Sequence, residues 1–544
     1  MFLNNAAVFK RKFYLKGEDM KRKIIFFGIA AVLLMAIVLF AGCKKQDGTG
    51  RPTIKVEIYD RGTDGGKTNP TNNKWTDWIK QKVLEDENIE VIFEPIPRGE
   101  ETQALINLMA AGTPPDVCMT YGNDNITNWA ELGGIFDLSP YIDTTLKDLK
   151  EFLGPDPALP GRDFIRRNMN AQTGQVWSMP GRRMNVARLN MFIRKDWLDK
   201  LGLPVPKTTQ EFYDTLVAFK EKNPGGVDKV VPFTTTTDAR WTAGSLLESF
   251  LQPDISVRDR WVNTVVDRYF LLPGYKEGVR FLNKMWNAGL IDTDFPLYRE
   301  EESMKNLIKS GVVGAFGHNW DQIFRESERL LTDLQRNVPD AMWIAVDCMT
   351  SSDGITHKIS YDPAGVNYFI PNSSKNPEAA MRYLNWLAKY ENYHFIQTGP
   401  EGIVHTMVDG VPKLNPSAGE GWIQNSSQNL DYTPMMNGLF LETEEESIKA
   451  IAAGYPWPPE MVMEAYNVAM TNARPGPVIA TSSPLTVAGP LNQTLVDKSN
   501  TFVVQSIVAP SANFDREWEK GIADWLASGA EAVRQERAEK FVEP

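Results

Sequence analysis

The sequence is poor in the residue types that most often carry out chemistry. Its 544 residues include three cysteines and four histidines, at positions 43, 118 and 348 and at 318, 357, 394 and 405. They form no CxxC pair, no Cys/His metal-ligand spacing and no HExxH motif, and the sequence has no GxSxG motif. We therefore expect no metal, no cofactor and no nucleophilic serine. Cys118 and Cys348 lie in apolar, strand-like runs, which favours buried thiols, with a disulfide between them as the alternative.

An excess of basic residues is also lacking. Lysine and arginine number 58 against 69 aspartates and glutamates, for a net charge of -11. Such a surface repels phosphate backbones and anionic lipid headgroups, which excludes nucleic acid as the expected partner. The sequence has no repeat of 20 to 50 residues, so a solenoid is excluded. A chain of this length is too long for one core and predicts two or more lobes.

One long apolar run occurs, near the start. Lys21, Arg22 and Lys23 precede it, it extends over residues 24–41, and Gly42 and Cys43 follow. This layout is typical of a signal peptide whose cysteine is acylated after cleavage, with a retained transmembrane helix as the alternative. We interpret residues 1–19 as an upstream extension, 20–42 as the signal and 43–52 as a polar tether; whether Met20 is the true start stays open.

The mature chain alternates strand and helix patterns. Residues 54–59 and 89–93 predict strands, and residues 75–84 and 102–109 predict helices. Such a βαβα opening, continued by 116–120, favours a mostly parallel sheet that meets ligands at the carboxyl ends of its strands. Further predicted helices are 192–201, 211–220, 377–389, 460–471 and 518–538, and further predicted strands are 230–233, 312–316, 343–346 and 366–370.

Five stretches together resemble a known family. Residues 108–117 (LMAAGTPPDV), 174–180 (GQVWSMP), 190–220, 311–321 (GVVGAFGHNWD) and 514–529 are similar to signature stretches of sugar-type extracellular solute-binding proteins of bacterial ABC importers. The most similar subgroup is the large lipoproteins that bind alginate and aldouronate oligosaccharides.

The resemblance implies a two-lobed α/β fold like that of periplasmic binding proteins. Each lobe would be a mostly parallel sheet flanked by helices and discontinuous in sequence, with 53–180 plus 311–365 in one lobe and 181–310 plus 366–544 in the other. The chain would cross between lobes near 180, 310 and 365. The implied function is capture of a sugar, an oligosaccharide above all, and its delivery to permease subunits. The protein would be a monomer without enzyme activity, lipid-anchored on the extracellular face of the cell membrane.

A sugar site needs aromatic platforms and convergent hydrogen-bonding groups on loops. The candidates that follow predicted strands or adjoin predicted crossings are Tyr121 with Asn123 and Asp124, Trp241 with Asp238 and Arg240, Asn319 and Trp320 with His318, Tyr361 with Asp362, Trp457, and Arg182 with Arg183. For each aromatic candidate the alternative is a capping or packing role. For the arginines it is a salt bridge between the lobes.

Two other motifs are rejected or doubtful. Residues 61–68 (RGTDGGKT) end like a phosphate-binding loop, but Arg61 stands where that motif needs glycine. Residues 221–231 occupy the place of a calcium loop in related binders but lack its alternating oxygen ligands, which makes a bound ion doubtful. Two alternatives to a transport role stay open: a surface glycoside hydrolase and a structural lipoprotein without a ligand.

Overall fold

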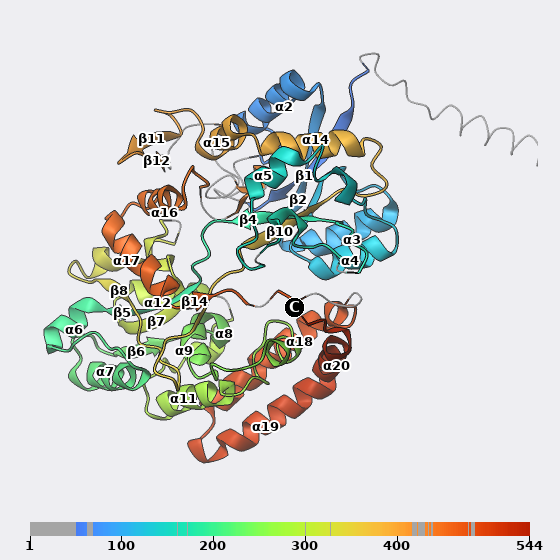
Figure 1. Cartoon of the computed structure of the whole chain (residues 1–544). Helices are drawn as coiled ribbons and strands as arrows, with labels where there is room; N and C mark the ends of the chain where they lie inside the picture. Colours follow the sequence, from blue (N-terminus) through green and yellow to red (C-terminus); the bar gives the residue numbers. More distant parts are fainter. Residues whose placement is uncertain are drawn as a thin grey trace, which may run out of the picture. The chain divides into compact units, whose positions relative to one another are not determined.

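The computed structural model describes residues 50–543, except for 63–68, 160, 171, 300, 327, 416–420, 423–429, 434, 437–438, 477 and 480–484. The predicted upstream extension, signal segment and Cys43 therefore lie outside the described residues. Thr53–Pro544 forms one unit of the chain (Figure 1).

The chain opens with the predicted alternation of strands and helices. Its first elements are β1 (Thr53–Asp60), α2 (Lys74–Glu87), β2 (Glu90–Pro97), α3 (Glu101–Ala111) and β3 (Cys118–Thr120). Asn73 caps the first turn of α2 through its side chain, and Asn88 ends that helix in the left-handed conformation. β1 pairs in parallel with β2, and Val56 bridges in parallel to Val117. The carboxyl ends of these three strands therefore lie at one edge.

Four strands form what we call the first sheet, in the order β13-β4-β10-β3. The added strands are β4 (Met179–Arg183), β10 (Ala364–Phe369) and β13 (Met435–Met436). β10 runs antiparallel to β3 and β4, whereas β13 runs parallel to β4. Helices α5 (Lys147–Leu153) and α14 (Pro377–Leu387) contact each other beside this sheet. Residues from distant parts of the chain, such as Ile54, Met179 and Trp386, thus share one core.

Four further strands form the second sheet, in the order β6-β7-β5-β8. They are β5 (Leu189–Arg194), β6 (Val231–Thr234), β7 (Val313–Asn319) and β8 (Trp343–Val346). Successive residues of β5 enter different cores: Met191 and Ile193 pack with Ala315, whereas Phe192 packs with Phe316. Because side chains alternate across a strand, both faces of this sheet are covered.

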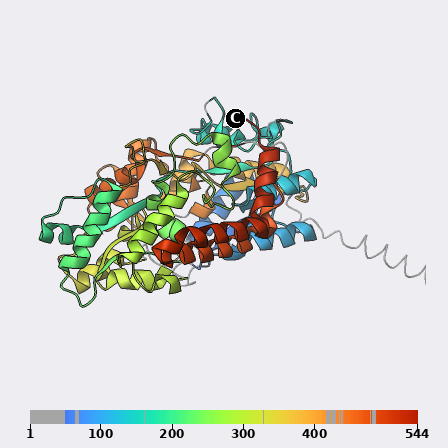
Figure 2. The same cartoon turned by 90° about the horizontal axis from the view of Figure 1, so that it is seen from below.

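The C-terminal helices pack against the second sheet's core. α11 (Tyr275–Asn287) contacts α18 (Ala488–Val508), which lies along α19 (Phe514–Trp525) (Figures 1 and 2). Gly529, with φ at 121°, interrupts the helix before α20 (Glu531–Lys540). The predicted helix 518–538 is therefore two helices, since only glycine adopts this conformation readily.

The remaining α-helices and strands range from 2 to 14 residues in length. The α-helices are α4 (Asn123–Glu131), α6 (Lys195–Leu201), α7 (Thr209–Lys222), α8 (Ala239–Thr242), α9 (Gly244–Glu248), α10 (Val257–Val262), α12 (Glu301–Lys309), α13 (Leu330–Asn337), α15 (Tyr390–Thr398), α16 (Glu444–Ala453) and α17 (Pro459–Met470). The strands are β9 (Lys358–Ile359), β11 (His405–Val408), β12 (Val411–Leu414) and β14 (Ala473–Arg474). The predicted helix 192–201 was wrong in its first part, because β5 occupies 189–194. A strand buried on both faces has a continuous apolar run that also fits a helix.

The chain passes from the first sheet to the second between β4 and β5 and returns between β8 and β10. After β13 it passes to the second sheet's side once more, where α17 contacts β5 and β8. We call residues 184–188 and 360–363, which adjoin β4 and β10, the crossing segments. No change of sheet occurs near 310, because β6 and β7 are neighbours, so the pairing differs from the expected grouping of 311–365 with 53–180. Both sheets are mixed rather than mostly parallel. β5 and β10 each enter their sheet from the crossing edge and therefore run against their neighbours.

Cys118 and Cys348 are buried and free, which confirms the predicted thiols. Burial raises the pKa of each thiol well above its ordinary value, so neither is a reactive thiolate.

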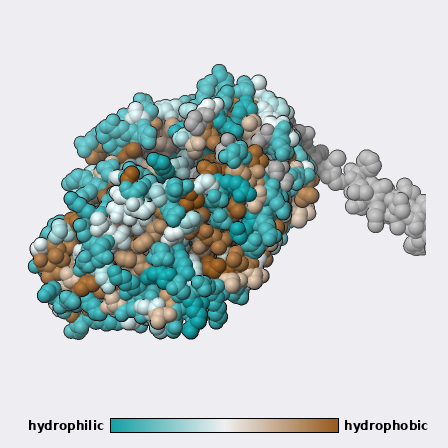
Figure 3. All heavy atoms as spheres, turned by 60° about the horizontal axis from the view of Figure 1, so that its bottom comes forward, coloured by the Kyte–Doolittle hydropathy of each residue, from teal (hydrophilic) through white to brown (hydrophobic). Residues whose placement is uncertain are grey.

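The visible face in Figure 3 is mostly hydrophilic, with hydrophobic residues gathered near its middle. Within the described part of the chain, no helix combines the length and the apolar character that crossing a membrane requires.

Candidate functional site

Residues that follow β6, together with residues 299–305 that precede β7, line a pocket of about 410 Å³. Its wall consists of Thr236, Asp238, Trp241, Arg299, Glu301, Glu302 and Lys305. β6 and β7 are parallel, so their carboxyl ends lie at the same edge of the second sheet, and α8, which carries Trp241, follows β6. The pocket thus combines one indole ring with charged groups of both signs.

A close approach between α8 and β7 fixes the position of Trp241. The hydroxyl of Thr242 accepts a hydrogen bond from the amide of Thr236 at 3.0 Å. A Cβ atom on Gly317 would lie 2.6 Å from the carbonyl oxygen of Thr242, so a larger residue would push α8 away. The Trp241 ring itself meets His318 edge-on, with centroids 6.0 Å apart. The backbone of β7 therefore determines where the indole lies.

His318 and Glu301 form a polar pair beside this ring. Nδ1 of His318 accepts from the amide of Asn319 at 2.8 Å, so Nε2 carries the proton and faces Glu301 at 3.0 Å. This contact with His318 is the main cause that lowers the pKa of Glu301 to about 2, and Lys305, 3.3 Å from the same carboxylate, adds to it. Glu301 is thus ionised near neutral pH and accepts hydrogen bonds rather than donating a proton.

A second cluster lies at the carboxyl ends of β1, β2 and β3. Tyr59 stacks on Tyr121 with ring centroids 6.3 Å apart. The guanidinium of Arg98 lies 5.1 Å from the centroid of Tyr59 and 4.3 Å from that of Tyr121. A 3.0 Å ion pair with the buried Glu101 holds Arg98 there. Tyr59 is fully buried and Tyr121 is half-buried, so Tyr121 is the ring of this stack that reaches the edge.

Arg183 and Tyr361 lie where the chain passes between the two sheets. The guanidinium of Arg183 lies 4.7 Å from the centroid of the Tyr361 ring. The hydroxyl of Tyr361 donates to Oδ1 of Asn319 at 3.1 Å, and its amide donates to the carbonyl of Val186 at 2.8 Å. The amide of Arg183 donates to the carbonyl of Pro363 at 2.7 Å. The crossing segments are therefore bonded to each other and bring the ends of β4 and β7 together.

The predicted residues Tyr121, Trp241, Asn319 and Tyr361 lie at these edges, and their contact with a ligand stays a prediction. Arg182 lies apart from them. Its Nη1 donates to the carbonyl of Leu153 at 2.8 Å, and its guanidinium lies over the rings of Phe164 and Phe440. No carboxylate among the described residues forms a salt bridge with Arg182, so the structure gives this side chain a packing role at the end of α5 instead of the ion pair considered from sequence.

Trp320 needs a correction. Its side chain is 2% exposed and meets Tyr455 and Tyr466 edge-on, with centroids 6.1 and 5.3 Å away. The ring lies in the core rather than on the surface where a ligand platform would be, because the chain turns inward after Asn319. Trp457 is half-buried against the same core. Asn123 and Asp124 begin α4, and their side chains lie outside what the structure describes.

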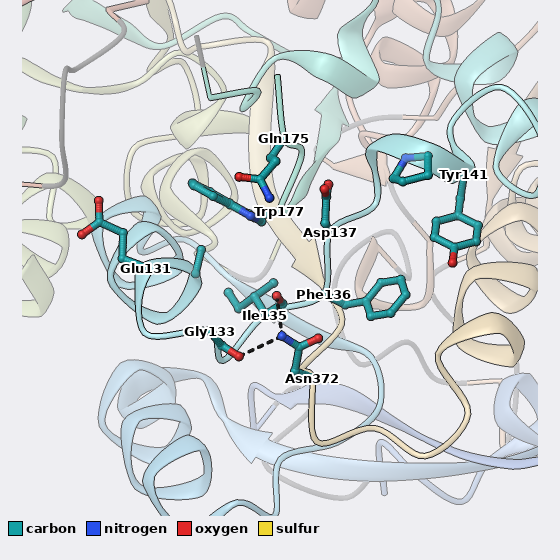
Figure 4. Close-up of a pocket in the computed structure, with 11 residues that line it drawn as sticks. Glu131, Gly133, Ile135, Phe136, Asp137, Tyr141, Gln175, Trp177 and Asn372 are labelled. Atoms are coloured by element: carbon teal, nitrogen blue, oxygen red, sulfur yellow. Dashed lines mark hydrogen bonds between the residues drawn. The ribbon is translucent and has the colours of Figure 1, made fainter. Parts of the chain in front are cut away.

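A larger pocket of about 580 Å³ lies at the other edge of the first sheet. Figure 4 shows Trp177, Gln175, Asp137 and Asn372 around it, and the Asn372 amide donates to the carbonyls of Gly133 and Ile135 at 2.8 and 3.0 Å. Asn372 follows β10, whose end pairs with the start of β3. This pocket therefore lies toward the end of β3 opposite Tyr121, and no residue predicted to bind ligand lines it.

Several residues of these edges were not predicted from the sequence. Arg98 follows β2, so the rule that directed attention to Tyr121 also applied to it, but the predicted strand ended at residue 93. Arg188 forms a buried 2.8 Å ion pair with Glu248, and its guanidinium lies 5.9 Å from the centroid of Trp241. Because residues 192–201 were predicted as a helix, the sequence did not indicate that Arg188 precedes a central strand. No sequence pattern marked Glu301 as a site residue, because only the fold brings its partner His318 next to it.

These edges offer aromatic and ionised groups for binding. Within the described ranges, no group of three or more His, Cys, Asp or Glu side chains is placed to hold a metal ion. Aromatic faces beside fixed, ionised hydrogen-bonding groups suit a ligand with apolar C–H faces and many hydroxyls.

Solved structures define the class of fold. The alginate-binding protein AlgQ2, crystallised without calcium ion, aligns with a TM-score of 0.59 at 19% identity, over 90% of this chain and 98% of that one. A solute-binding protein of Bifidobacterium longum infantis, described as HMO-binding and associated with an ABC transporter, aligns with a TM-score of 0.61 at 18% identity over the same shares. The fold is therefore of the periplasmic-binding-protein type.

Sequence comparison adds a match to a family model over part of the chain. Residues 69–292 match the model described as bacterial extracellular solute-binding protein, which confirms the resemblance indicated by the sequence motifs. The fructooligosaccharide ABC transporter substrate-binding protein FusA of Streptococcus pneumoniae is 28% identical over 54% of this chain, and Lipoprotein LipO of Bacillus subtilis is 26% identical over 58%. These alignments span 58% and 61% of the two relatives' own lengths. The polygalacturonan/rhamnogalacturonan-binding protein YtcQ of Bacillus subtilis is 20% identical over 94% of this chain and 98% of its own.

Proposed function

We propose that this protein captures an oligosaccharide outside the cytoplasmic membrane and delivers it to the permease subunits of an ABC importer. The observation that carries the proposal is that Trp241, Tyr121 and Tyr361 lie at the carboxyl ends and crossing points of two sheets, each beside a fixed polar group. Rings of this kind stack on the C–H faces of sugars, and ionised groups bind their hydroxyls. The names of FusA and YtcQ support a saccharide ligand.

The ligand would lie between two lobes. We propose that one lobe comprises the first sheet with β1 and β2, and that the other comprises the second sheet with α11, α18 and α19. The crossing segments 184–188 and 360–363 would form the hinge between them. Mutual hydrogen bonds between the segments, such as that from Tyr361 to Val186, support their moving together.

The protein would release its ligand without chemical change. A glycoside hydrolase needs one carboxyl group with a raised pKa that donates a proton to the leaving oxygen. Glu301, the carboxylate in direct contact with His318, has a pKa lowered to about 2 and cannot serve as that acid near neutral pH. This supports binding without hydrolysis at this pocket.

Titration calorimetry of the purified protein with neutral and acidic oligosaccharides, followed by chromatography of each mixture, tests the proposal. We expect saturable binding of at least one oligosaccharide and its recovery at full length. Cleavage products would favour the hydrolase alternative. The absence of heat with every sugar would favour a structural lipoprotein.

The location of the protein has its own test. We propose that Cys43 is diacylated after removal of residues 20–42, because Ala41 and Gly42 provide the small residues that cleavage needs. Two or more acyl chains are needed for stable anchoring. The protein should therefore label with a fatty-acid analogue and remain in the membrane fraction, whereas the Cys43→Ser variant should do neither. An unlabelled wild-type protein would contradict the anchor.

We also propose that the protein is a monomer. Light scattering of the protein without residues 1–52 should give the mass of a monomer.

A further inference from the structure

The pocket of about 580 Å³ beside the first sheet is separate from the residues proposed to contact the oligosaccharide. Its wall includes Asn372, which follows β10, and the last residue of β10 pairs with Cys118 at the start of β3. Tyr121 follows the opposite end of β3. The volume falls within the roughly 300–1,000 Å³ that small-molecule sites occupy. The pocket therefore has room for a small ligand of its own.

Backbone hydrogen bonds hold the wall of this pocket together. The amide of Phe136 donates to the carbonyl of Ile370 at 2.8 Å, and the amide of Leu138 donates to the carbonyl of Val176 at 2.8 Å. Residues 133–138 are thus bonded on one side to the segment after β10 and on the other to the segment before β4. A wall built in this way needs little ordering when a ligand binds, which reduces the entropic cost of binding.

Three half-buried aromatic side chains line the pocket, namely Phe136, Tyr141 and Trp177 (Figure 4). The rings of Phe136 and Tyr141 have centroids 5.7 Å apart and pack against the first sheet's core. Trp177 packs against a neighbouring cluster around Leu105. This packing fixes each ring and leaves part of it accessible to a ligand. The face of an aromatic ring carries partial negative charge and attracts cations.

Asp137, which lines the same pocket, has one carboxylate oxygen fixed and the other left for a ligand. Its Oδ1 accepts from the amide and the hydroxyl of Ser139 at 3.0 and 2.7 Å, and from the amide of Val176 at 3.3 Å. Across the described ranges of the chain, no hydrogen bond or salt bridge involves its Oδ2. The side-chain amide of Asn372 donates to two backbone carbonyls of the wall at 2.8 and 3.0 Å, so its Oδ1 is left as a second acceptor.

The charged groups of the pocket have one sign. Asp137 and the exposed Glu131 are both carboxylates, and the described lining contains neither lysine nor arginine. An anionic ligand would lack a counter-charge here, and a neutral ligand would cover Asp137 without balancing its charge. A protonated amine balances this charge and donates charge-assisted hydrogen bonds to the carboxylate and to Oδ1 of Asn372. Its body packs against the aromatic faces, which also attract the cation.

We propose that this pocket is a second binding site, which takes a small protonated amine whose body has apolar faces. Asp137 supplies the counter-charge, Asn372 accepts a further hydrogen bond, and Trp177 with its two neighbouring rings contacts the body of the ligand. The proposal goes beyond oligosaccharide capture and does not depend on it, because no residue of this pocket belongs to the edges that carry Tyr121 and Trp241.

Calorimetry with two matched pairs of ligands tests the proposal. The probes are glucosamine and phenethylamine, each compared with its N-acetylated form, which has no charge. We expect the wild-type protein to bind at least one amine about tenfold more tightly than its acetylated form, since only the amine gains the charge-assisted hydrogen bonds. Asp137→Asn keeps an oxygen for the bonds that fix Oδ1 but removes the charge. It should reduce the affinity for that amine by about tenfold.

Glu151→Gln is the matched control, because it removes the same charge from an exposed carboxylate that pairs with Lys147 at 3.7 Å and does not line the pocket. It should leave both affinities unchanged, and thermal unfolding of each variant verifies the fold. Equal affinity for each amine and its acetylated form, binding of neither amine, or equal losses in the two variants would overturn the inference.

Two further results would also overturn it. A lysine-containing peptide that binds through Asp137 when neither small amine does would assign the pocket to a protein partner. Displacement of the amine by a saturating oligosaccharide would place the amine among the sugar-binding residues instead of in this pocket. The proposed function would remain intact in either case, and Asp137→Asn should bind oligosaccharides as tightly as the wild-type protein does.

Discussion

Two tryptophans near the second sheet have different surroundings and should respond differently to replacement. Trp241 is half-buried and lines the pocket beside His318, whereas Trp320 is 2% exposed among Tyr455 and Tyr466. Trp241→Ala should weaken oligosaccharide binding by about 1–3 kcal/mol and leave stability nearly unchanged. Trp320→Ala should lower the free energy of unfolding by about 3–5 kcal/mol through the cavity it creates. Calorimetry and urea unfolding measure the two effects, and wild-type affinity in Trp241→Ala would remove this ring from the site.

Glu301 should make stability depend on pH. Its pKa is lowered from 4.5 to about 2 in the folded protein, chiefly by its contact with His318. A lowered folded pKa adds stability that is fully present above the unfolded value and is lost as the pH falls toward the folded one. The free energy of unfolding of the wild-type protein should therefore exceed that of Glu301→Gln between pH 5.5 and 7, as measured in urea. The difference should shrink below about pH 4.5. A constant difference down to pH 3 would contradict the pairing.

At the residue scale, the sequence could predict positions but not partners. Tyr121 and Trp241 were found because each follows a strand, and strand ends can be read from local patterns. Trp320 also follows a strand, but the turn that begins directly after β7 places its side chain in the core. The ion pairs of Arg61 with Asp431 and of Arg188 with Glu248 join residues far apart in sequence, so no local pattern could announce them.

Helix α8 is short, so the backbone beneath it must hold Trp241 in place. Gly317→Ala would set a Cβ atom 2.6 Å from the Thr242 carbonyl oxygen and 2.8 Å from the sulfur of Met191. We expect a loss of about 1–3 kcal/mol of stability from this overpacking, together with weaker sugar binding because α8 shifts. The matched control is Gly489→Ala, at a position with no neighbouring atom within 4 Å. Unfolding and calorimetry provide both readouts. Unchanged affinity in Gly317→Ala would show that α8 does not position the indole.

At the element scale, alternation and capping signals were reliable. Strands predicted at 54–59 and 312–316 correspond to β1 and β7, and the helix predicted at 211–220 lies within α7, which Thr208 caps. The failure at 192–201 occurred where β5 is buried on both faces, since a central strand lacks the alternation that marks a half-exposed one. Sheet order could not be predicted. β7 pairs with β5 and β6 because the chain between these strands brings β7 back beside them. The residue pattern within a strand does not encode the path of the chain that connects it to the next one.

At the scale of the whole molecule, the crossing segments determine how a bound ligand can change the arrangement of the two lobes. Both connect the two sheets, and hydrogen bonds from Tyr361 to Val186 and from Arg183 to Pro363 couple them. A ligand that contacts Trp241 on one side and Tyr121 on the other binds best when these residues approach each other, so it favours a closer arrangement of the lobes. We expect small-angle X-ray scattering to show a smaller radius of gyration at saturating oligosaccharide than without it. Trp241→Ala, which removes one of the two contacts, should reduce the change at equal ligand occupancy. Arg166→Gln is the unaffected control, because Arg166 pairs with the exposed Asp143 at 2.7 Å, away from both rings. Identical scattering curves with and without a ligand that calorimetry shows to be bound would contradict hinge closure while leaving the binding site in place.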